Sequence, residues 1–400
     1  MPLLPNEDAP SEELISQARN SLAQPGANEL TVITSLRAQG HGVDALRLAL
    51  EQVELRDKAA LAWKNSGRPR QNWYFTRDGL EAASHPLIAG FHARVISHAG
   101  VIANGGIAGV IDLTAGLGSD SAAFIDAGLS TSAVERDPDT AALLARNVPG
   151  ANILICDCTQ LDLTQWNPEQ TVIFIDPARR GTSRSPDGAR ALPERDPERW
   201  SPPISFVNEL AKTFRVFVKA APAFRPPEGW AQYIVSLDAN VVEMFTTNAA
   251  TGTYAVMINS EREETSIITG STDPVTHQHV EISAEGFLYE LDPAITRAGL
   301  AQQVAAELGL TPVGEKNMWL FGAATPFPHA RAYLVHDVFP VKEIKSRVKH
   351  LPGIAVKTKD GRREQKDLRK ACAKPDHNEW AVVILGSGAT EQAVLVQRER

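Results

Sequence analysis

Four acidic residues each follow a short apolar run in the first half of the chain. They are Asp112, Glu135, Asp157 and Asp176, spaced 23, 22 and 19 residues apart. Each spacing is about the length of one strand plus a crossover segment in a doubly wound sheet. The carboxyl ends of parallel strands meet at one rim, and ligands bind there in open α/β sheets. We therefore expect these four carboxylates to line one rim.

Two closely spaced glycines follow the first of these acids. The segment 110–120 reads Val-Ile-Asp-Leu-Thr-Ala-Gly-Leu-Gly-Ser-Asp and leads into a helical pattern, which predicts a strand, a tight turn and a helix N-terminus. Glycine allows the unusual backbone of such a turn and lets a ligand approach the peptide groups. Ser121 stands where a dinucleotide fingerprint needs its third glycine, and the chain has no G-x-x-x-x-G-K-[ST] loop. Both facts argue against NAD and ATP.

The ordered set of glycines and acids resembles class I S-adenosylmethionine (SAM) dependent methyltransferases. In that family the Asp-Leu-Thr-Ala-Gly-Leu-Gly stretch wraps the methionine part of SAM, the acid after the second strand binds the ribose hydroxyls, and the acid after the third lies near the adenine amine. The resemblance gives these roles to Asp112, Gly116, Gly118, Glu135 and Asp157. The expected cofactor-binding set also contains Thr114, Ala115, Asp120, Arg136, Cys158 and Asp176.

Physical chemistry agrees with a sulfonium cofactor at an acidic rim. A carboxylate can accept hydrogen bonds from both ribose hydroxyls, and a cationic sulfonium tolerates acidic surroundings that a pyrophosphate would not. The alternative interpretation is a doubly wound domain whose strands merely end in acidic residues.

The turn after Asp176 is the candidate catalytic element. Methyl transfer to nitrogen is an in-line displacement, so the protein mainly positions the acceptor and accepts hydrogen bonds from its amine. Asp176 followed by Pro177 gives a fixed turn, in the position of the Asp-Pro-Pro-Tyr motif of amino methyltransferases. Ala178 and Arg179 replace the second proline and the aromatic residue. Arg179 or Arg180 can stack on a base or grip phosphate; a plain ion pair between Arg179 and Asp176 is the alternative.

The three cysteines narrow the chemistry further. Enzymes with a related Asp-Pro-Pro-Arg turn methylate uracil C5 through a nucleophilic cysteine, but this domain has no cysteine after Cys158. We therefore favour a ring or exocyclic nitrogen as acceptor. Cys156 and Cys158 alternate on one predicted strand and Cys372 is isolated, which predicts packing rather than a disulfide or metal site.

Two further segments supply candidate substrate residues. A helix predicted over Leu80–His98 follows a possible cap at Thr76. In the methyltransferases that the chain resembles, a Phe-Thr-x-x-x-Leu-Glu-x-Ala helix lies over the cofactor pocket, so Thr76 and Glu81 are candidates, with plain capping and surface roles as the alternative. Lys219 closes another predicted strand beside Asp176, where its ammonium group would hold phosphate or neutralise the carboxylate.

Three regions are expected along the chain. Helical periodicity predicts an N-terminal helical domain over 1–72, followed by the methyltransferase domain over 73–260 and, after a polar linker, a C-terminal region over 277–400. The Gly-, Ser-, Arg- and Pro-rich segment 181–203 is expected to be a lid or a surface insert. A helix is predicted over 293–308. The fold class is therefore α/β, a Rossmann-like doubly wound sheet with a helical domain before it and an α+β domain after it.

The end of the chain, about 326–400, resembles the THUMP-like domain that follows RNA methyltransferases in bacteria. THUMP domains hold RNA ends. Residues 341–376 contain twelve Lys and Arg against five Asp and Glu, a local charge of 12 − 5 = +7 in a chain of net charge −8. Such asymmetry indicates a nucleic-acid face. Its candidate RNA contacts are Lys357, Lys359, Arg362 and Arg363.

Composition sets the remaining expectations. With 43% hydrophobic residues, no apolar run of eighteen and an acidic, proline-bearing N-terminus, the chain is expected to be globular and cytoplasmic, with no membrane partner and no metal. We expect a SAM-dependent methyltransferase (EC 2.1.1.-) that modifies a base nitrogen of tRNA or rRNA. The alternatives are a methyltransferase for protein or small molecules, and a non-catalytic SAM- or RNA-binding protein.

Overall fold

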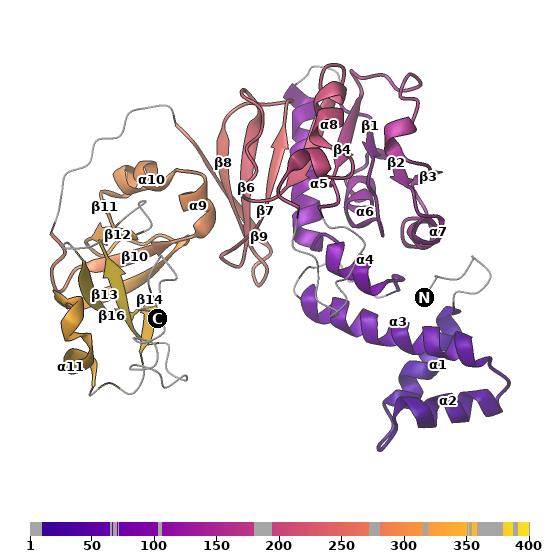
Figure 1. Ribbon diagram of the computed structural model, residues 1–400, viewed down its shortest axis with the longest axis horizontal. Coiled ribbons are helices and arrows are strands. Elements are labelled where there is room, and N and C mark those ends of the chain that lie inside the picture. The colour runs from indigo at the N-terminus through magenta and orange to yellow at the C-terminus, as the bar shows by residue number, and fades with distance from the viewer. Residues whose placement is uncertain are drawn as a thin grey trace. The chain divides into compact units, whose positions relative to one another are not determined.

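Two compact units make up the chain in the computed structural model (Figure 1). The first contains residues 1–232, 243–251 and 258–265, and the second contains residues 233–242, 252–257 and 266–400. The structure describes residues 10–64, 66, 70, 72–102, 106–179, 194–271, 281–314, 319–349, 351, 354–357, 379–386 and 391–399. Among these residues no helix is both long enough and apolar enough to cross a membrane.

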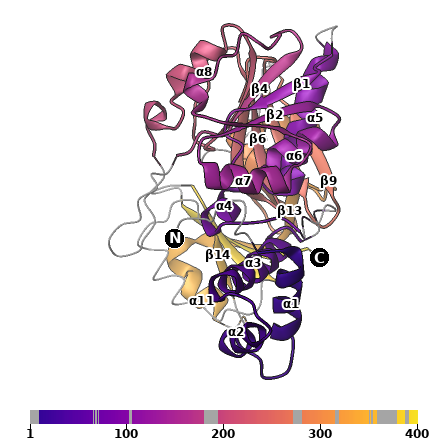
Figure 2. The ribbon, with the colours of Figure 1, turned by 90° about the vertical axis from the view of Figure 1, so that its right-hand side faces the viewer.

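Three helices begin the first unit, as the sequence predicts: α1 (Glu12–Leu22), α2 (Glu29–Ala38) and α3 (Val43–Ala62). The Ser11 hydroxyl accepts a hydrogen bond from the Leu14 N–H at 3.2 Å, and two glutamates in the first turn of α1 suit the helix dipole. Figure 2 shows these helices packed together beside α4 (Arg77–Ala82) and α7 (Pro138–Asn147). Their apolar faces share one core with residues of the glycine turn, such as Leu117.

The first sheet has nine strands in the order β3-β2-β1-β4-β5-β7-β6-β8-β9. Their bounds are β1 (Gly109–Asp112), β2 (Ser130–Glu135), β3 (Asn152–Ile155), β4 (Thr171–Ile175), β5 (Arg215–Ala220), β6 (Ala231–Leu237), β7 (Asn240–Thr247), β8 (Thr253–Asn259) and β9 (Glu264–Thr269). Strands β1 to β5 are parallel, and β7 is antiparallel to β5. This confirms the predicted α/β fold with a doubly wound, mainly parallel sheet.

Helices cover both faces of the parallel strands. On one face α5 (Pro86–Ile102) and α6 (Ser119–Asp126) pack through an aromatic layer in which Phe91 and Phe124 contact Phe174 and Phe245. On the other face α8 (Ile204–Leu210) inserts Val207 into an aliphatic core. Because each strand alternates its side chains between these two layers, residue parity decides which layer a side chain enters.

Four details of the predicted elements are wrong. The helix expected over 80–98 is two helices, because Pro86 begins α5 and proline forces the preceding residue out of the helical region. The helix expected over 293–308 divides into α9 (Pro293–Arg297) and α10 (Ala301–Leu308) at Gly299, where φ is +75°. Cys158 lies beyond β3, in the 3-10 turn η1 (Cys158–Gln160) that Asp157 caps. The expected polar linker 260–276 contains β9, whose polar residues suit a sheet edge.

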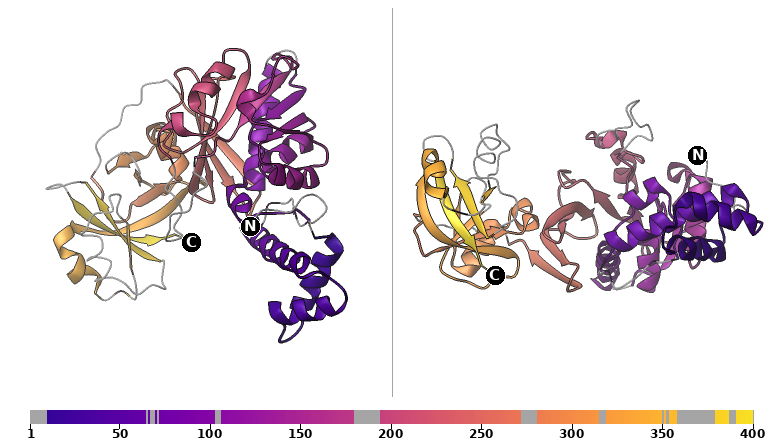
Figure 3. Two further views of the ribbon diagram at one scale, coloured as in Figure 1. Left: turned by 45° about the vertical axis from the view of Figure 1, so that its right-hand side comes forward. Right: turned by 90° about the horizontal axis from the view of Figure 1, so that it is seen from below.

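The second unit contains a seven-stranded sheet in the order β11-β12-β10-β13-β16-β15-β14. Its strands are β10 (Phe287–Leu291), β11 (Thr311–Val313), β12 (Trp319–Gly322), β13 (Ala330–Pro340), β14 (Ala355–Lys357), β15 (Trp380–Leu385) and β16 (Gln392–Arg398). All pairings are antiparallel except that of β14 with β15. Helix α11 (Ile344–Val348) lies on one face of this sheet (Figure 3). Its Ile344 and Val348 side chains share a core with residues of the strands.

Candidate functional site

The two glycines of the turn after β1 serve different purposes. Gly118 has φ of +92°, and a Cβ atom there would lie 2.4 Å from Val148 Cγ2 and 2.6 Å from Leu144 Cδ1. The close approach of α6 and α7 therefore excludes a side chain. Gly116 has φ of +54°, and a Cβ atom there would meet nothing within 4 Å. The space beside the Gly116 Cα is therefore open and leaves room for a ligand.

This turn meets the turn after β4. Strands β1 and β4 are neighbours, while β2 and β3 lie on one side of them and β5 on the other. The connections therefore diverge between β1 and β4, and ligands bind at such a switch point. The Thr114 hydroxyl accepts a hydrogen bond from the Asp176 N–H at 2.7 Å. This bond joins the glycine turn to the candidate catalytic turn.

Asp112 lies beneath the glycine turn rather than on an open rim, since only 1% of its surface is exposed. Its carboxyl accepts hydrogen bonds from the Ser121 hydroxyl at 2.6 Å and from the Thr114 N–H at 3.3 Å. Burial raises the pKa of Asp112 to about 7. The observed contacts of Asp112 therefore hold the turn in shape.

Glu135 ends β2, and Asp157 lies two residues after the end of β3. One Glu135 oxygen accepts from the Gly116 N–H at 3.1 Å and the other from the Asp137 N–H at 2.9 Å. Asp157 is exposed, and its Oδ1 accepts from the N–H and the hydroxyl of Thr159 at 2.9 and 2.7 Å, which lowers the Asp157 pKa. A carboxylate offers about four lone-pair sites. Both groups therefore retain capacity for ligand hydroxyls or amines.

Arg136 and Cys158 directly follow these two acids in the sequence. Arg136 is exposed and donates to the Ser201 hydroxyl at 3.3 Å. Cys158 is half-buried, and burial raises the pKa of its thiol to about 11, so it stays protonated near neutral pH. Ala115 donates its N–H to the Val134 carbonyl at 3.0 Å and thereby anchors the turn on β2.

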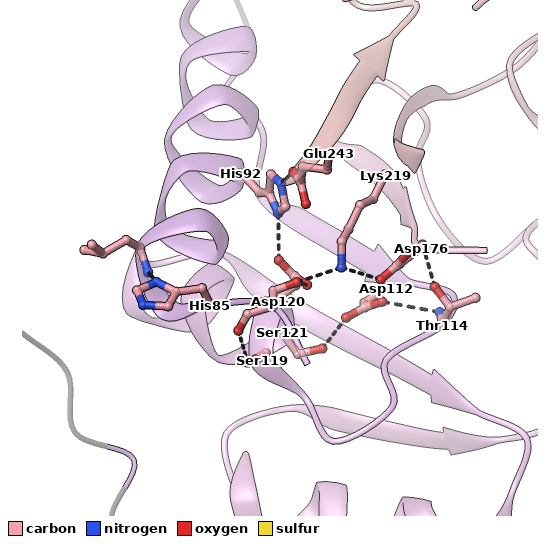
Figure 4. Close-up of polar contacts among 12 residues, drawn as sticks. His85, His92, Asp112, Thr114, Ser119, Asp120, Ser121, Asp176, Lys219 and Glu243 are labelled. Carbon is pink, nitrogen blue, oxygen red and sulfur yellow. Dashed lines mark hydrogen bonds and ion pairs between the residues drawn. The ribbon is translucent and has the colours of Figure 1, made fainter. Parts of the chain in front are cut away.

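Asp176 forms an ion pair with Lys219 from β5, with Lys219 Nζ 2.6 Å from Asp176 Oδ2. Figure 4 shows Lys219 and Asp176 side by side, and Lys219 also donates to the Ser84 hydroxyl at 3.1 Å. Burial alone would lower the Lys219 pKa, but the carboxylates of Asp176, Glu243 and Asp120 raise it. Lys219 is therefore a cation beside Asp176, as predicted, and it neutralises that carboxylate.

Behind this pair lies a histidine that the sequence analysis did not single out. His92 on α5 is fully buried, with Nδ1 2.7 Å from Asp120 Oδ1 and Nε2 2.5 Å from Glu243 Oε1. Burial opposes a charge on the ring, but the two carboxylates raise the His92 pKa to about 9. An imidazole donates from both nitrogens only when it is protonated. His92 is therefore an imidazolium near neutral pH.

The sequence contains signals that His92 and Glu243 are buried polar residues. His92 is four residues after Ile88 and four before Ile96, so it interrupts an apolar helix stripe, and Glu243 interrupts an apolar strand. A polar residue inside such a pattern indicates a buried partner. The sequence does not reveal which residue is the partner, because His92 and Glu243 are 151 residues apart.

The candidate catalytic turn is anchored to a later segment. Pro177 is buried, and Ala178 exchanges two backbone hydrogen bonds with Ser201, at 2.8 and 3.1 Å. The Arg179 side chain is half-buried. The ion pair that the structure gives Asp176 is the one with Lys219 rather than one with Arg179.

The remaining candidates are spread over the chain. The Thr76 hydroxyl caps α4 by accepting from the Gly79 N–H at 2.9 Å, and Glu81 is exposed on the same helix. Lys357 forms an ion pair with Glu290 inside the second unit, and its Nζ lies 5.0 Å from the centre of the Tyr333 ring. Arg180, Lys359, Arg362 and Arg363 lie outside the described residues.

One solved structure has a similar fold over nearly the whole chain. No family model matches the chain, and no curated protein matches its sequence. A solved structure from Porphyromonas gingivalis W83, described as a "putative methyltransferase", superposes with a TM-score of 0.70 at 18% identity, over 98% of this chain and 99% of that one. At this identity the likeness establishes a shared fold over nearly the whole chain.

Two other solved structures are similar over smaller parts. The SAM-dependent methyltransferase NGO1261 from Neisseria gonorrhoeae has a TM-score of 0.24 at 19% identity, over 35% of this chain and 64% of that one. A Pyrococcus horikoshii protein described as a "putative RNA methyltransferase" has a TM-score of 0.22 at 16% identity, over 42% of this chain and 71% of that one.

The two glycines should respond differently to alanine. Gly118→Ala forces a methyl group against α7 and strains a left-handed residue, so it should lower the free energy of unfolding by about 1–3 kcal/mol. Gly116→Ala should cost less, because it adds strain without a clash. Urea denaturation of both variants measures this, and equal losses would contradict the packing role of Gly118.

The His92 ion pairs should make stability depend on pH. The folded pKa of about 9 lies above the ordinary 6.5, so the contribution of His92 is complete below pH 6.5 and is lost as pH rises through 9. The free energy of unfolding should fall by about 1–3 kcal/mol over this window. His92→Gln should flatten this part of the profile, as measured by urea denaturation across the window. An unchanged slope in the variant would show that other groups cause the fall.

Proposed function

We propose that this chain is a SAM-dependent methyltransferase (EC 2.1.1.-) that methylates a base nitrogen of tRNA or rRNA. The observation that carries the proposal is the meeting of two turns at the switch point of the sheet. The glycine turn after β1 and the Asp-Pro turn after β4 are joined by the bond between Thr114 and Asp176. Acids at the ends of β2 and β3 continue the same rim.

SAM fits the residues around the glycine turn. The open approach to Gly116 would admit its methionine part, Glu135 would accept hydrogen bonds from the ribose, and Asp157 would lie near the adenine amine. An excess of carboxylates suits a sulfonium cation and disfavours a pyrophosphate. When bound, SAM supplies an electrophilic methyl group.

The chain's own residues would then position the acceptor. Burial raises the pKa of Asp176, and the Lys219 ammonium group opposes that rise. The Asp176 carboxylate would accept a hydrogen bond from the N–H of the acceptor and so orient the nitrogen lone pair. Pro177 and the backbone pairing of Ala178 with Ser201 hold this turn in one conformation. Arg179 would stack on the base or contact a phosphate.

RNA is the proposed partner because of the C-terminal region. The +7 segment and the resemblance of about 326–400 to a THUMP-like domain support an RNA-binding role for region 277–400. The other proposed regions are a methyltransferase domain over 73–260 and a helical domain over 1–72. Within that segment Lys342, Lys345 and Lys349 are exposed and could contact phosphates. A location in the cytoplasm, where tRNA and rRNA are found, accords with this role.

Two aspartates provide a test of cofactor binding and its matched control. Asp157 and Asp162 make the same turn, since each Oδ1 accepts from the N–H and the hydroxyl of the threonine two residues later. Asp157→Ala should weaken binding of S-adenosylhomocysteine at least about tenfold in calorimetry, which is the loss of one charge-assisted hydrogen bond. Asp162→Ala should leave affinity unchanged. Absence of binding by the wild-type chain would overturn the proposal.

Catalysis should depend on Asp176 more than cofactor binding does. Asp176→Asn removes the charged acceptor of hydrogen bonds, so transfer of labelled methyl groups should fall about a hundredfold while S-adenosylhomocysteine affinity changes less than about threefold. The substrate is RNA from cells that lack the gene. RNase-insensitive transfer would favour a protein or small-molecule acceptor, and binding without any transfer would favour the non-catalytic alternative.

A further inference from the structure

We infer that His92 is a positioning residue for the methyl-acceptor site and that its positive charge commits Lys219 to Asp176. The inference rests on the proposed function, because that function makes Asp176 the acceptor of hydrogen bonds. His92 itself is buried and lies behind the site. It acts through other side chains.

A continuous chain of hydrogen bonds connects His92 to the site. Figure 4 labels four of its members, His92, Asp120, Lys219 and Asp176. From His92 it runs through Asp120, whose Oδ2 accepts from the Ser84 hydroxyl at 2.6 Å. Ser84 in turn accepts from Lys219 at 3.1 Å, and Lys219 pairs with Asp176 at 2.6 Å. Every link has the length of a direct hydrogen bond.

Side chains alternate between the two faces of a strand, and this alternation brings Lys219 and Glu243 to the same face of the sheet. Lys219 is two residues after Phe217, and Glu243 is two residues before Phe245, so each charged side chain shares a face with a buried ring. These two rings lie 5.8 Å apart, and the His92 ring is 4.4 Å from Phe245. Aromatic rings thus line one side of the network, where the interactions between charges are stronger than in water.

Competition for the lysine explains why the histidine matters. Three carboxylates, those of Asp176, Glu243 and Asp120, act on Lys219. His92 contacts two of them directly. While the imidazolium neutralises Asp120 and Glu243, Lys219 is left for Asp176. Without that charge, two buried acids would draw Lys219 away from the site.

The chain ends where a substrate could enter. Exposure is lowest at the His92 end of the chain and highest at the Asp176 end: the charged side chains are 0% exposed at His92, 10% at Asp120, 13% at Lys219 and 26% at Asp176. A purely structural ion cluster would have no need to end on the one carboxylate that the acceptor would meet. This gradient is the feature that favours positioning over simple stabilisation.

The direct test measures the ionisation of Asp176. Groups that face it are Lys219 from β5, Asp120 from α6, Glu243 from β7 and Asp112 from β1. We expect His92→Gln to move the Asp176 titration to higher pH by about one unit, because Lys219 is then shared. Carbon-13 NMR of protein labelled at aspartate Cγ follows this titration, with the Asp176 signal assigned by its loss in Asp176→Asn.

The same shift should govern turnover. In His92→Gln the acidic limb of the kcat profile should move to higher pH by about one unit, so kcat on that limb should fall about tenfold while affinity for S-adenosylhomocysteine changes less than about twofold. Adding Glu243→Gln removes one competing acid, so the double variant should recover part of the wild-type limb. His336→Gln, at an exposed histidine of the second unit, is the control.

Other outcomes separate this inference from the proposed function. A wild-type chain that binds no S-adenosylhomocysteine would refute the proposed function, whereas the Asp176 titration would still decide whether His92 acts on it. If His92→Gln lowers stability but leaves the titration in place, the inference is overturned. Should that variant fail to fold, Ser84→Ala breaks the middle link without removing a charge, and it should shift the titration in the same direction by a smaller amount.

Discussion

A carboxylate held at the end of a buried strand needs a positive partner, and this requirement organises the candidate site. Asp176 ends a strand whose five residues are all buried, so its charge is costly unless it is paired. The partner comes from the adjacent parallel strand, where Lys219 reaches the same rim. Asp120 and Glu243 are two further buried acids near Lys219, and one lysine cannot neutralise all three carboxylates. His92, on the helix that covers this face, supplies the second cation.

The N-terminal helices are part of the same construction. The segment Trp73–Phe75 lies between them and the sheet domain, and buried amides satisfy its backbone on both sides. Gln52 of α3 exchanges two hydrogen bonds with Phe75, at 2.8 and 2.9 Å. Asn147 of α7 exchanges two with Tyr74 and donates a third to the Leu117 carbonyl of the glycine turn, at 3.1 Å. The helices thereby support the turn that would hold the cofactor.

The features of this fold that depend on local sequence pattern are predictable from the sequence. Apolar runs closed by acids predicted β1 to β4, and strand order predicted that Lys219 lies beside Asp176. The sequence did not predict the burial of Asp112, because an acid at a strand end is ordinarily solvated and only the Ser121 contact shows otherwise. Nor did it predict the pairing of His92 with Glu243, which depends on the register of an antiparallel strand far along the chain. Register is a tertiary property that the pattern of one strand does not encode.

The commitment of Lys219 also bears on how a nucleic acid would be held. Its ammonium group has three N–H donors, and Asp176 and Ser84 each accept one. The charge and two of the three donors are therefore already engaged, and the Lys219 side chain is only 13% exposed, so exposed cations are better placed to grip a phosphate. In the proposed enzyme, phosphate contacts therefore belong to exposed cations such as Lys342 and Lys345, while Lys219 serves the chemistry. The site then separates the two tasks: buried charges set the state of Asp176, and solvated charges hold the RNA.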